Sequence, residues 1–187
     1  MFFDVLDAFL AGFKARAFDP KTVTPEEEED IIDEMLDLYL LAYWEGSKEA
    51  ADALMFNEEP SIEKAQEAID EKVDGKGFRE RVRAYLHGDM GETTGTPAEA
   101  IARVAETDSV RIFNQGGLDA AIAAGATLKT WQTMEDDKVR ASHEILDLQT
   151  VPIDAYFYTG DDQALAPGRF SKAENNVNCR CTLKFSK

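Results

Sequence analysis

Near its C-terminus the chain reads Cys179-Arg-Cys-Thr-Leu-Lys-Phe185. This stretch decides the fold class because its side chains alternate between apolar and polar. In an extended strand, successive side chains point to opposite faces. One face would carry Cys181, Leu183 and Phe185, and the other Arg180, Thr182 and Lys184. An alternation of this kind is typical of a strand with one buried face. We therefore expect the C-terminal part of the chain to contain a sheet.

The residues before this strand favour further short extended pieces. Residues 128–134 (LKTWQTM) alternate and are rich in Thr, so they predict a second strand. Shorter extended segments are expected at 151–153 and 156–158, with a short helix over 136–146. Residues 129–187 are thus predicted to form a small, loop-rich α+β module.

Helical periodicity dominates the chain up to Gly125. Helices are predicted over residues 2–17, 25–55, 61–73, 78–86 and from 97 onward, with a polar loop over 87–96. Thr24-Pro25 and Thr96-Pro97 have the N-cap and first-turn residues that begin helices. The longest helix should supply much of the core through Ile31, Ile32, Met35, Leu36, Tyr39, Leu40, Tyr43 and Trp44. Gly116-Gly117 is expected to interrupt or bend the last helix, which should end at Gly125.

These patterns predict an α+β fold with a mainly helical N-terminal part and a C-terminal module. We assign residues 1–95 to an acidic helical region, 96–128 to a helical lead-in and 129–187 to the module. The charge supports a boundary near Leu128, because residues 1–128 hold 28 acids against 12 Lys and Arg, and residues 129–187 hold 9 against 8. The formal net charge of the chain is -17.

This acidic surface indicates protein partners. It repels phosphate backbones, so nucleic acid is not expected as a ligand of the acidic part. No run of apolar residues approaches the roughly 20 that cross a membrane, and the N-terminus lacks the pattern of a signal peptide. We therefore expect neither a membrane span nor export.

Three potential metal ligands occur in the module: His143, Cys179 and Cys181. Zinc accepts thiolate and imidazole ligands, and a small module would be stabilised by a metal cross-link. The fourth ligand would come from Asp136, Asp137 or Asp147. The cysteine spacing is shorter than in most zinc sites, and on a straight strand the sulfurs would lie about 7 Å apart. The alternative is that both cysteines are reduced core residues of a cytosolic protein and that His143 is a hydrogen-bonded anchor.

Other polar residues favour structural roles. Ser142 and His143 are adjacent, so on a helix their side chains would diverge and could not act as a catalytic pair. Arg140 is expected to pair with Asp136 or Asp147. His87 falls in the polar loop, where we expect it to be exposed.

An ordered series of motifs runs through the module. It comprises Lys129-Thr-Trp131, Asp136-Asp-Lys-Val-Arg140-Ala-Ser-His143, Val151-Pro-Ile-Asp154 with Phe157, Pro167-Gly168, and Asn175-Asn-Val-Asn178-Cys179-Arg180-Cys181. The series resembles the C-terminal domain of the phage Mu F-like family of minor head proteins. One departure concerns Leu146-Asp147-Leu148, where the family has Leu-Asp-Gly. A glycine would permit a positive φ in that turn.

The resemblance implies a minor head protein that acts in head morphogenesis of a tailed bacteriophage. Such a protein would be assembled in the bacterial cytoplasm and reside in the virion, bound to portal or inner capsid proteins. A catalytic role is not the first expectation. Because Mu F-like domains also occur with toxin modules, the alternative is a nuclease-like protein with His143 as base and Arg140 or Arg180 as phosphate partner.

Overall fold

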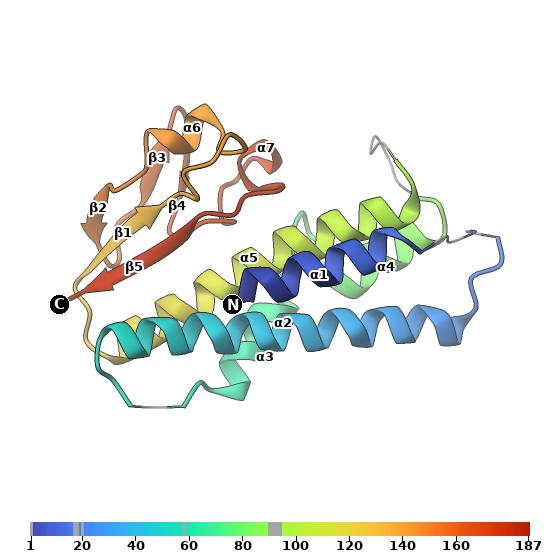
Figure 1. Ribbon diagram of the computed structural model, residues 1–187, viewed down its shortest axis with the longest axis horizontal. Helices are drawn as coiled ribbons and strands as arrows, with labels where there is room; N and C mark the ends of the chain where they lie inside the picture. Colours follow the sequence, from blue (N-terminus) through green and yellow to red (C-terminus); the bar gives the residue numbers. More distant parts are fainter. Residues whose placement is uncertain (1, 17–18, 20, 58, 90–94) are drawn as a thin grey trace.

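The computed structural model describes residues 2–16, 19, 21–57, 59–89 and 95–187. Within these residues a helical part carries a small module of strands and loops (Figure 1). The helical part contains α1 (Phe2–Lys14), α2 (Pro25–Ala53), α3 (Ile62–Asp70), α4 (Phe78–Leu86) and α5 (Pro97–Ala123). The module contains β1 (Leu128–Gln132), α6 (Ala141–Glu144), β2 (Thr150–Pro152), β3 (Phe157–Thr159), β4 (Asp162–Ala164), α7 (Ala173–Asn176) and β5 (Thr182–Ser186). The predicted α+β class is confirmed.

The two long helices begin as their sequences predict. The Thr24 hydroxyl accepts the backbone N–H of Glu27 at 3.2 Å, and the Glu27 carboxylate accepts the N–H of Thr24 at 2.8 Å. Thr96 and Glu99 form the same reciprocal capping box at the start of α5. Each box satisfies two N–H groups that a helix start leaves without partners.

The glycine pair of α5 does not interrupt the helix, so that prediction is wrong. A Cβ atom at Gly116 would lie 2.2 Å from the carbonyl oxygen of Tyr43, and one at Gly46 would lie 2.0 Å from that of Phe113. These glycines let the backbones of α2 and α5 approach closely. The helix ends at Ala123, and Gly125 follows its C-cap residue as predicted, with a φ of 74°. The Ala126 N–H then donates to the carbonyl of Ala121 at 2.9 Å.

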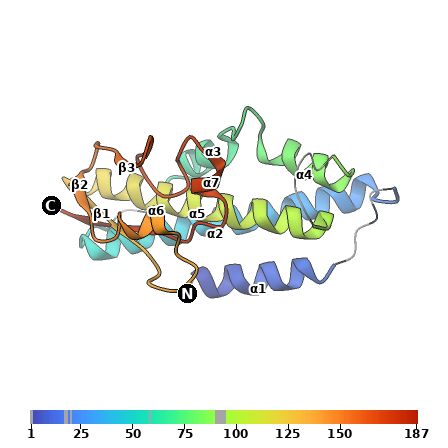
Figure 2. The ribbon, with the colours of Figure 1, turned by 90° about the horizontal axis from the view of Figure 1, so that it is seen from above.

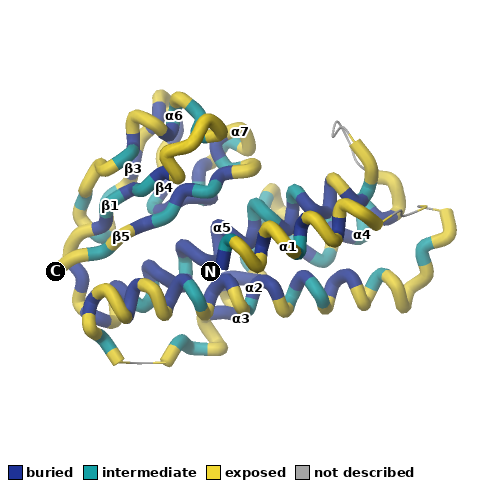
Figure 3. The backbone as a smooth tube through the Cα atoms, in the orientation of Figure 1, coloured by how far each residue is buried: buried dark blue, intermediate teal, exposed yellow. Residues whose placement is uncertain are grey.

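The helical core is formed by side chains from α1 to α5. Figure 3 shows the buried stripe along α2 and α5. The expected core residues of α2 are buried at Ile31, Ile32, Met35, Tyr39 and Tyr43. Leu36 and Leu40 are only partly buried, and the prediction for Trp44 is wrong, since it is 40% exposed.

Several predicted boundaries shift. The α3 helix ends at Asp70 because Val73 bridges to Lys76 around a turn with positive φ at Asp74 and Gly75. The helix predicted over 136–146 is a single turn, α6, and the final strand begins at Thr182. The predicted end of the first helix at Ala17 and residues 90–94 of the polar loop lie outside the described residues.

The module contains two small antiparallel sheets. One has the order β2-β1-β5, with Trp131 opposite Leu183, and the other is the β3–β4 pair. Trp131, Phe157, Phe170 and the two cysteines form its core. The module lies over α5, as both ribbon views show (Figures 1 and 2), and Phe185 of β5 is near Gly117. No helix among the described residues has the length and hydrophobicity to cross a bilayer.

Candidate functional site

The three potential metal ligands meet in the core of the module. The Sγ atoms of Cys179 and Cys181 lie 3.6 and 3.5 Å from Nδ1 of His143. All three ligand atoms lie within 4.8 Å of one another, and all three residues are buried. The separation of about 7 Å expected on a straight strand is therefore wrong. The backbone has a positive φ of 57° at Asn178, and both cysteines precede β5, so they do not follow strand geometry.

Aromatic rings enclose the cluster. The Trp131 ring packs edge-on against the His143 imidazole at 5.4 Å, and Phe170 stacks on its face at the same distance. A cavity of about 10 Å³ adjoins the cluster and is lined by both cysteines, His143 and Arg140. A space of this size holds at most about one water-sized group. The arrangement thus gives a buried set of donors enclosed by aromatic rings.

The cysteines differ in their proton affinity. A hydrogen bond from Cys181, with a smaller contribution from His143, holds the pKa of the Cys179 thiol well below its usual range despite burial. The neighbouring Cys179 and burial raise the pKa of Cys181. The contact between the two sulfurs therefore eases loss of the first proton from the pair and opposes loss of the second. A thiolate is the form that binds metals.

Two of the three acidic residues expected as a fourth ligand, Asp136 and Asp147, have other partners. Asp136 accepts two hydrogen bonds from Arg180, at 2.6 and 2.7 Å, and Asp147 accepts from the N–H and hydroxyl of Thr133. In the part of the chain that the structure describes, the cluster contains only His143 and the two cysteines.

Among the described residues, Arg140 pairs with backbone carbonyls and with neither Asp136 nor Asp147, so that prediction is wrong. Its Nη1 and Nη2 atoms donate to the carbonyls of Glu174 and Val177, each at 2.5 Å. These carbonyls belong to α7 and its C-cap residue. Arg140 thereby joins the start of α6 to the end of α7, just before the cysteines.

The other motif residues surround the sheet. Burial lowers the pKa of Lys129 to about 8, opposed by the charge of Asp154, and Lys129 Nζ lies 5.6 Å from the centre of the Phe157 ring. The Asn178 N–H donates to Thr107 Oγ1 of α5 at 3.4 Å. Asn178 thereby links the module to α5 directly before Cys179.

Two further predictions concerned Ser142, which was not expected to be catalytic, and His87, which was expected to be exposed. The Ser142 carbonyl accepts a hydrogen bond from Thr159, which is a structural contact. The side chain of His87 is 53% exposed, as expected, and its Nε2 lies 2.8 Å from Glu28.

Sequence reasoning missed Asp162, which organises the loop before the cysteines. Its carboxylate accepts hydrogen bonds from the backbone N–H groups of Gln163, Ser171 and Lys172, the Ser171 hydroxyl and the Asn175 amide. Burial opposes its ionisation, but these donors outweigh burial and lower the pKa of Asp162. Its sequence neighbourhood, Gly160-Asp-Asp, gives no signal beyond a turn.

The fold and site define a class of α+β proteins in which a strand-and-loop module on a helical base encloses a His–Cys–Cys cluster. The family model described as "Phage Mu protein F like protein" matches residues 61–184, which is more than half of the chain. The chain belongs to this family. The resemblance predicted for residues 129–187 is thus confirmed, and the match also includes α3, α4 and α5.

One curated relative is the NAD(+)--arginine ADP-ribosyltransferase EFV of Enterococcus faecalis. It is 30% identical to this chain over 113 residues, which cover 58% of the chain and 22% of the relative. The chain therefore spans about a fifth of that relative's length. No solved structure matches the chain.

Proposed function

We propose that the protein is a minor head protein that acts in head morphogenesis of a tailed bacteriophage. Family membership carries this proposal. The partners would be portal or inner capsid proteins, with the virion as the final location. The acidic helical part supports a role in protein docking, since residues 1–128 carry most of the net charge of -17.

Co-sedimentation with procapsids tests this role. The purified chain is mixed with procapsids that contain the portal and with shells assembled without it. We expect the chain to sediment with the portal-containing particles, and binding to both would identify the inner shell as the partner. Absence from both kinds of particle would contradict the proposal.

The cluster of His143, Cys179 and Cys181 supports a zinc site in the same module. Imidazole and thiolate donors suit zinc, and the adjoining cavity leaves space for a fourth, small ligand such as water. The ion would join α6 to the residues before β5. These segments lie 36 or more residues apart in sequence, so a cross-link between them would stabilise the module.

Elemental analysis of the purified protein tests the zinc site. We expect about one zinc per chain, and loss of the metal in Cys181→Ala. The matched control is His87→Ala, which removes the exposed histidine of the helical part and should keep its zinc. Protein prepared with zinc available that contains no metal would end the zinc proposal and favour a purely structural cluster.

The alternative of a nuclease that uses His143 has less support. A general base must approach the proton that it removes, but His143 is 2% exposed and its Nδ1 faces the two sulfurs. Hydrolysis of RNA or DNA by the purified chain, lost in His143→Ala, would restore this alternative. The ADP-ribosyltransferase activity in the relative's name belongs to a protein of which this chain covers 22%.

A further inference from the structure

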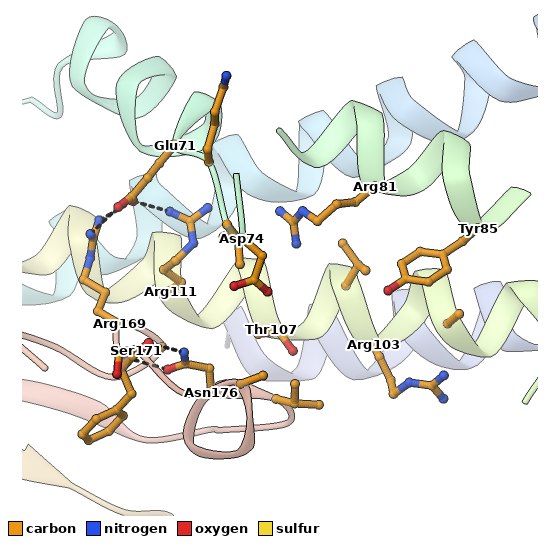
Figure 4. A pocket seen from close by; sticks show the side chains of 18 residues that line it. Glu71, Asp74, Arg81, Tyr85, Arg103, Thr107, Arg111, Arg169, Ser171 and Asn176 are labelled. Carbon is orange, nitrogen blue, oxygen red and sulfur yellow. Dashed lines mark hydrogen bonds and ion pairs between the residues drawn. The ribbon is translucent and has the colours of Figure 1, made fainter. Parts of the chain in front are cut away.

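A second, larger cavity lies outside the metal cluster. It is a cleft of about 470 Å³ between the helical part and the module (Figure 4). Its walls come from α4, α5, the connection between α3 and α4, and residues 168–177. Sites for small molecules commonly have volumes of about 300–1,000 Å³. The cleft is therefore large enough for a small organic ligand.

The lining of the cleft is cationic, although the chain as a whole is strongly acidic. Five basic side chains line it against two carboxylates. The basic residues are Lys72, Arg81, Arg103, Arg111 and Arg169, and the acids are Glu71 and Asp74. Charge of one sign concentrated in a cleft raises the local concentration of the opposite ion. An anion is the ligand that this lining favours.

Three of the arginines are held in place by carboxylates. Glu71 accepts from Nη1 of Arg111 at 2.6 Å and from both terminal nitrogens of Arg169 at 2.7 and 2.8 Å. Asp108 accepts from Arg81 at 2.6 Å. Figure 4 shows Glu71 between the two guanidinium groups. This arrangement fixes the cations before any ligand arrives.

Several nitrogens of these arginines donate no hydrogen bond within the described residues. Arg111 is 3% exposed, its Nη2 atom has no hydrogen-bond partner there, and its Nε atom lies 3.8 Å from Asp108 Oδ1, beyond hydrogen-bond distance. The Nε atoms of Arg81 and Arg169 also have no hydrogen-bond partner among the described residues. An arginine in a protein stays charged, and a buried donor without an acceptor is destabilising. An incoming anion with several oxygens, together with small side-chain shifts, would supply the missing acceptors.

The rest of the lining is apolar or aromatic. The apolar residues are Val73, Ala100, Val104, Phe170, Ala173 and Val177. The Tyr85 ring lies at the end of the cleft away from Glu71 and Arg169 (Figure 4). A ligand that fits both parts would have an anionic group at one end and an apolar or planar group at the other.

We propose that this cleft binds a small phosphate monoester. A phosphate carries more charge than a carboxylate and has three terminal oxygens that can accept from several guanidinium groups at once. The phosphate would lie beside Arg111 and Arg169, and the organic group beside Val104 and Tyr85. This assignment is independent of the role in head morphogenesis and of the metal.

Calorimetric titration of the full chain with phenyl phosphate tests the proposal. We expect saturable binding of phenyl phosphate, weaker binding of inorganic phosphate, and none of phenol. Higher salt should weaken the binding, because charge attraction is screened. No saturable binding of phenyl phosphate would overturn the proposal, as would tighter binding of phenylacetate, which would identify a carboxylate site such as one for an acidic peptide.

Two substitutions should change the affinity in opposite directions. Arg169→Gln removes a phosphate partner and should weaken binding about tenfold. Glu71→Gln removes the carboxylate that competes for Arg111 and Arg169, and should strengthen binding several-fold. The control Arg16→Gln breaks an exposed ion pair with Glu34; neither residue lines the cleft, so the affinity should stay unchanged.

The paired design separates binding from folding. A variant that merely loosened the fold would weaken binding, so tighter binding by Glu71→Gln cannot come from lost stability. If Arg169→Gln does not fold, Arg169→Lys keeps the charge without the planar fork and should bind less tightly than the unmodified chain. Unchanged affinity in both the Glu71 and Arg169 variants would overturn the proposal.

Discussion

Leu148 has a φ of 58°, in the left-handed region that costs most L-residues about 1–2 kcal/mol. Its N–H donates to the carbonyl of Trp131 at 2.9 Å, so the backbone is held in this conformation. The side chain is 65% exposed and contributes little packing. The sequence indicated a positive φ in this turn, because the family has glycine at this position.

Leu148→Gly should therefore stabilise the protein. We expect the free energy of unfolding to rise by about 1 kcal/mol, since glycine adopts a positive φ without strain. Urea unfolding at neutral pH measures the change. Leu148→Ala keeps the strained backbone and should give no gain. Equal stabilities of the Gly and Ala variants would show that the strain is not significant.

Asp162 should make stability depend on pH. Its pKa is lowered in the folded protein, so its stabilising contribution is present above the unfolded pKa of about 3.9 and is lost as the pH falls through the folded value. Asp162→Asn should cost about 2 kcal/mol at pH 7, because charge-assisted hydrogen bonds are replaced by weaker ones. Urea unfolding measures the free energy of unfolding of the variant and of the unmodified protein, and the difference between the two should narrow below about pH 4. If this difference did not depend on pH, the ionised Asp162 carboxylate would not be the source of the stability.

At the scale of elements, the crossing of α2 and α5 depends on small residues. The sequence marked Gly116-Gly117 as a helix breaker because glycine has low helix propensity. The structure shows that close packing determines its role, since the nearest atoms belong to the backbone of α2. No local pattern contains that information. The partner glycine, Gly46, is 70 residues away in sequence.

Gly116→Ala should destabilise the protein by about 1–3 kcal/mol or more, because the new methyl group overlaps the carbonyl of Tyr43. Thermal unfolding measures the change. Gly12→Ala in α1 is the matched control, since a Cβ there meets no atom within 4 Å. That substitution should stabilise by up to about 1 kcal/mol through helix propensity. The same sign of change in both variants would contradict the packing argument.

At the scale of the whole molecule, the helical part and the module each have a hydrophobic core, and a third, small cluster connects them where Ile153 and Phe185 pack against Leu54 and Ala121. The larger core joins α1 to α5, and the smaller surrounds Trp131 and the two cysteines. Trp131 lies 5.4 Å from the His143 ring, so its fluorescence reports on the cluster. The boundaries predicted at residues 95 and 128 stay predictions.

If zinc occupies the cluster, a chelator should affect the two parts differently. We expect the Trp131 emission to change and the melting temperature of the module to fall, while far-UV circular dichroism retains most of its helical signal. The measurement uses a Trp44→Phe background, which removes the exposed tryptophan of α2. Loss of helical signal in parallel with the fluorescence change would show that the parts unfold as one unit.

The sequence alone determined the features that depend on local chemistry. Capping residues determined the starts of α2 and α5, alternation predicted the sheet, and an ordered motif series identified the family. Only the tertiary structure decided the features that depend on distant residues. These are the contact of His143 with both sulfurs, the close crossing of α2 and α5 at their glycines, the donors around Asp162 and the cationic cleft. The physical reason is that propensity and periodicity act within a few residues along the chain, whereas packing and charge act between side chains that folding brings together.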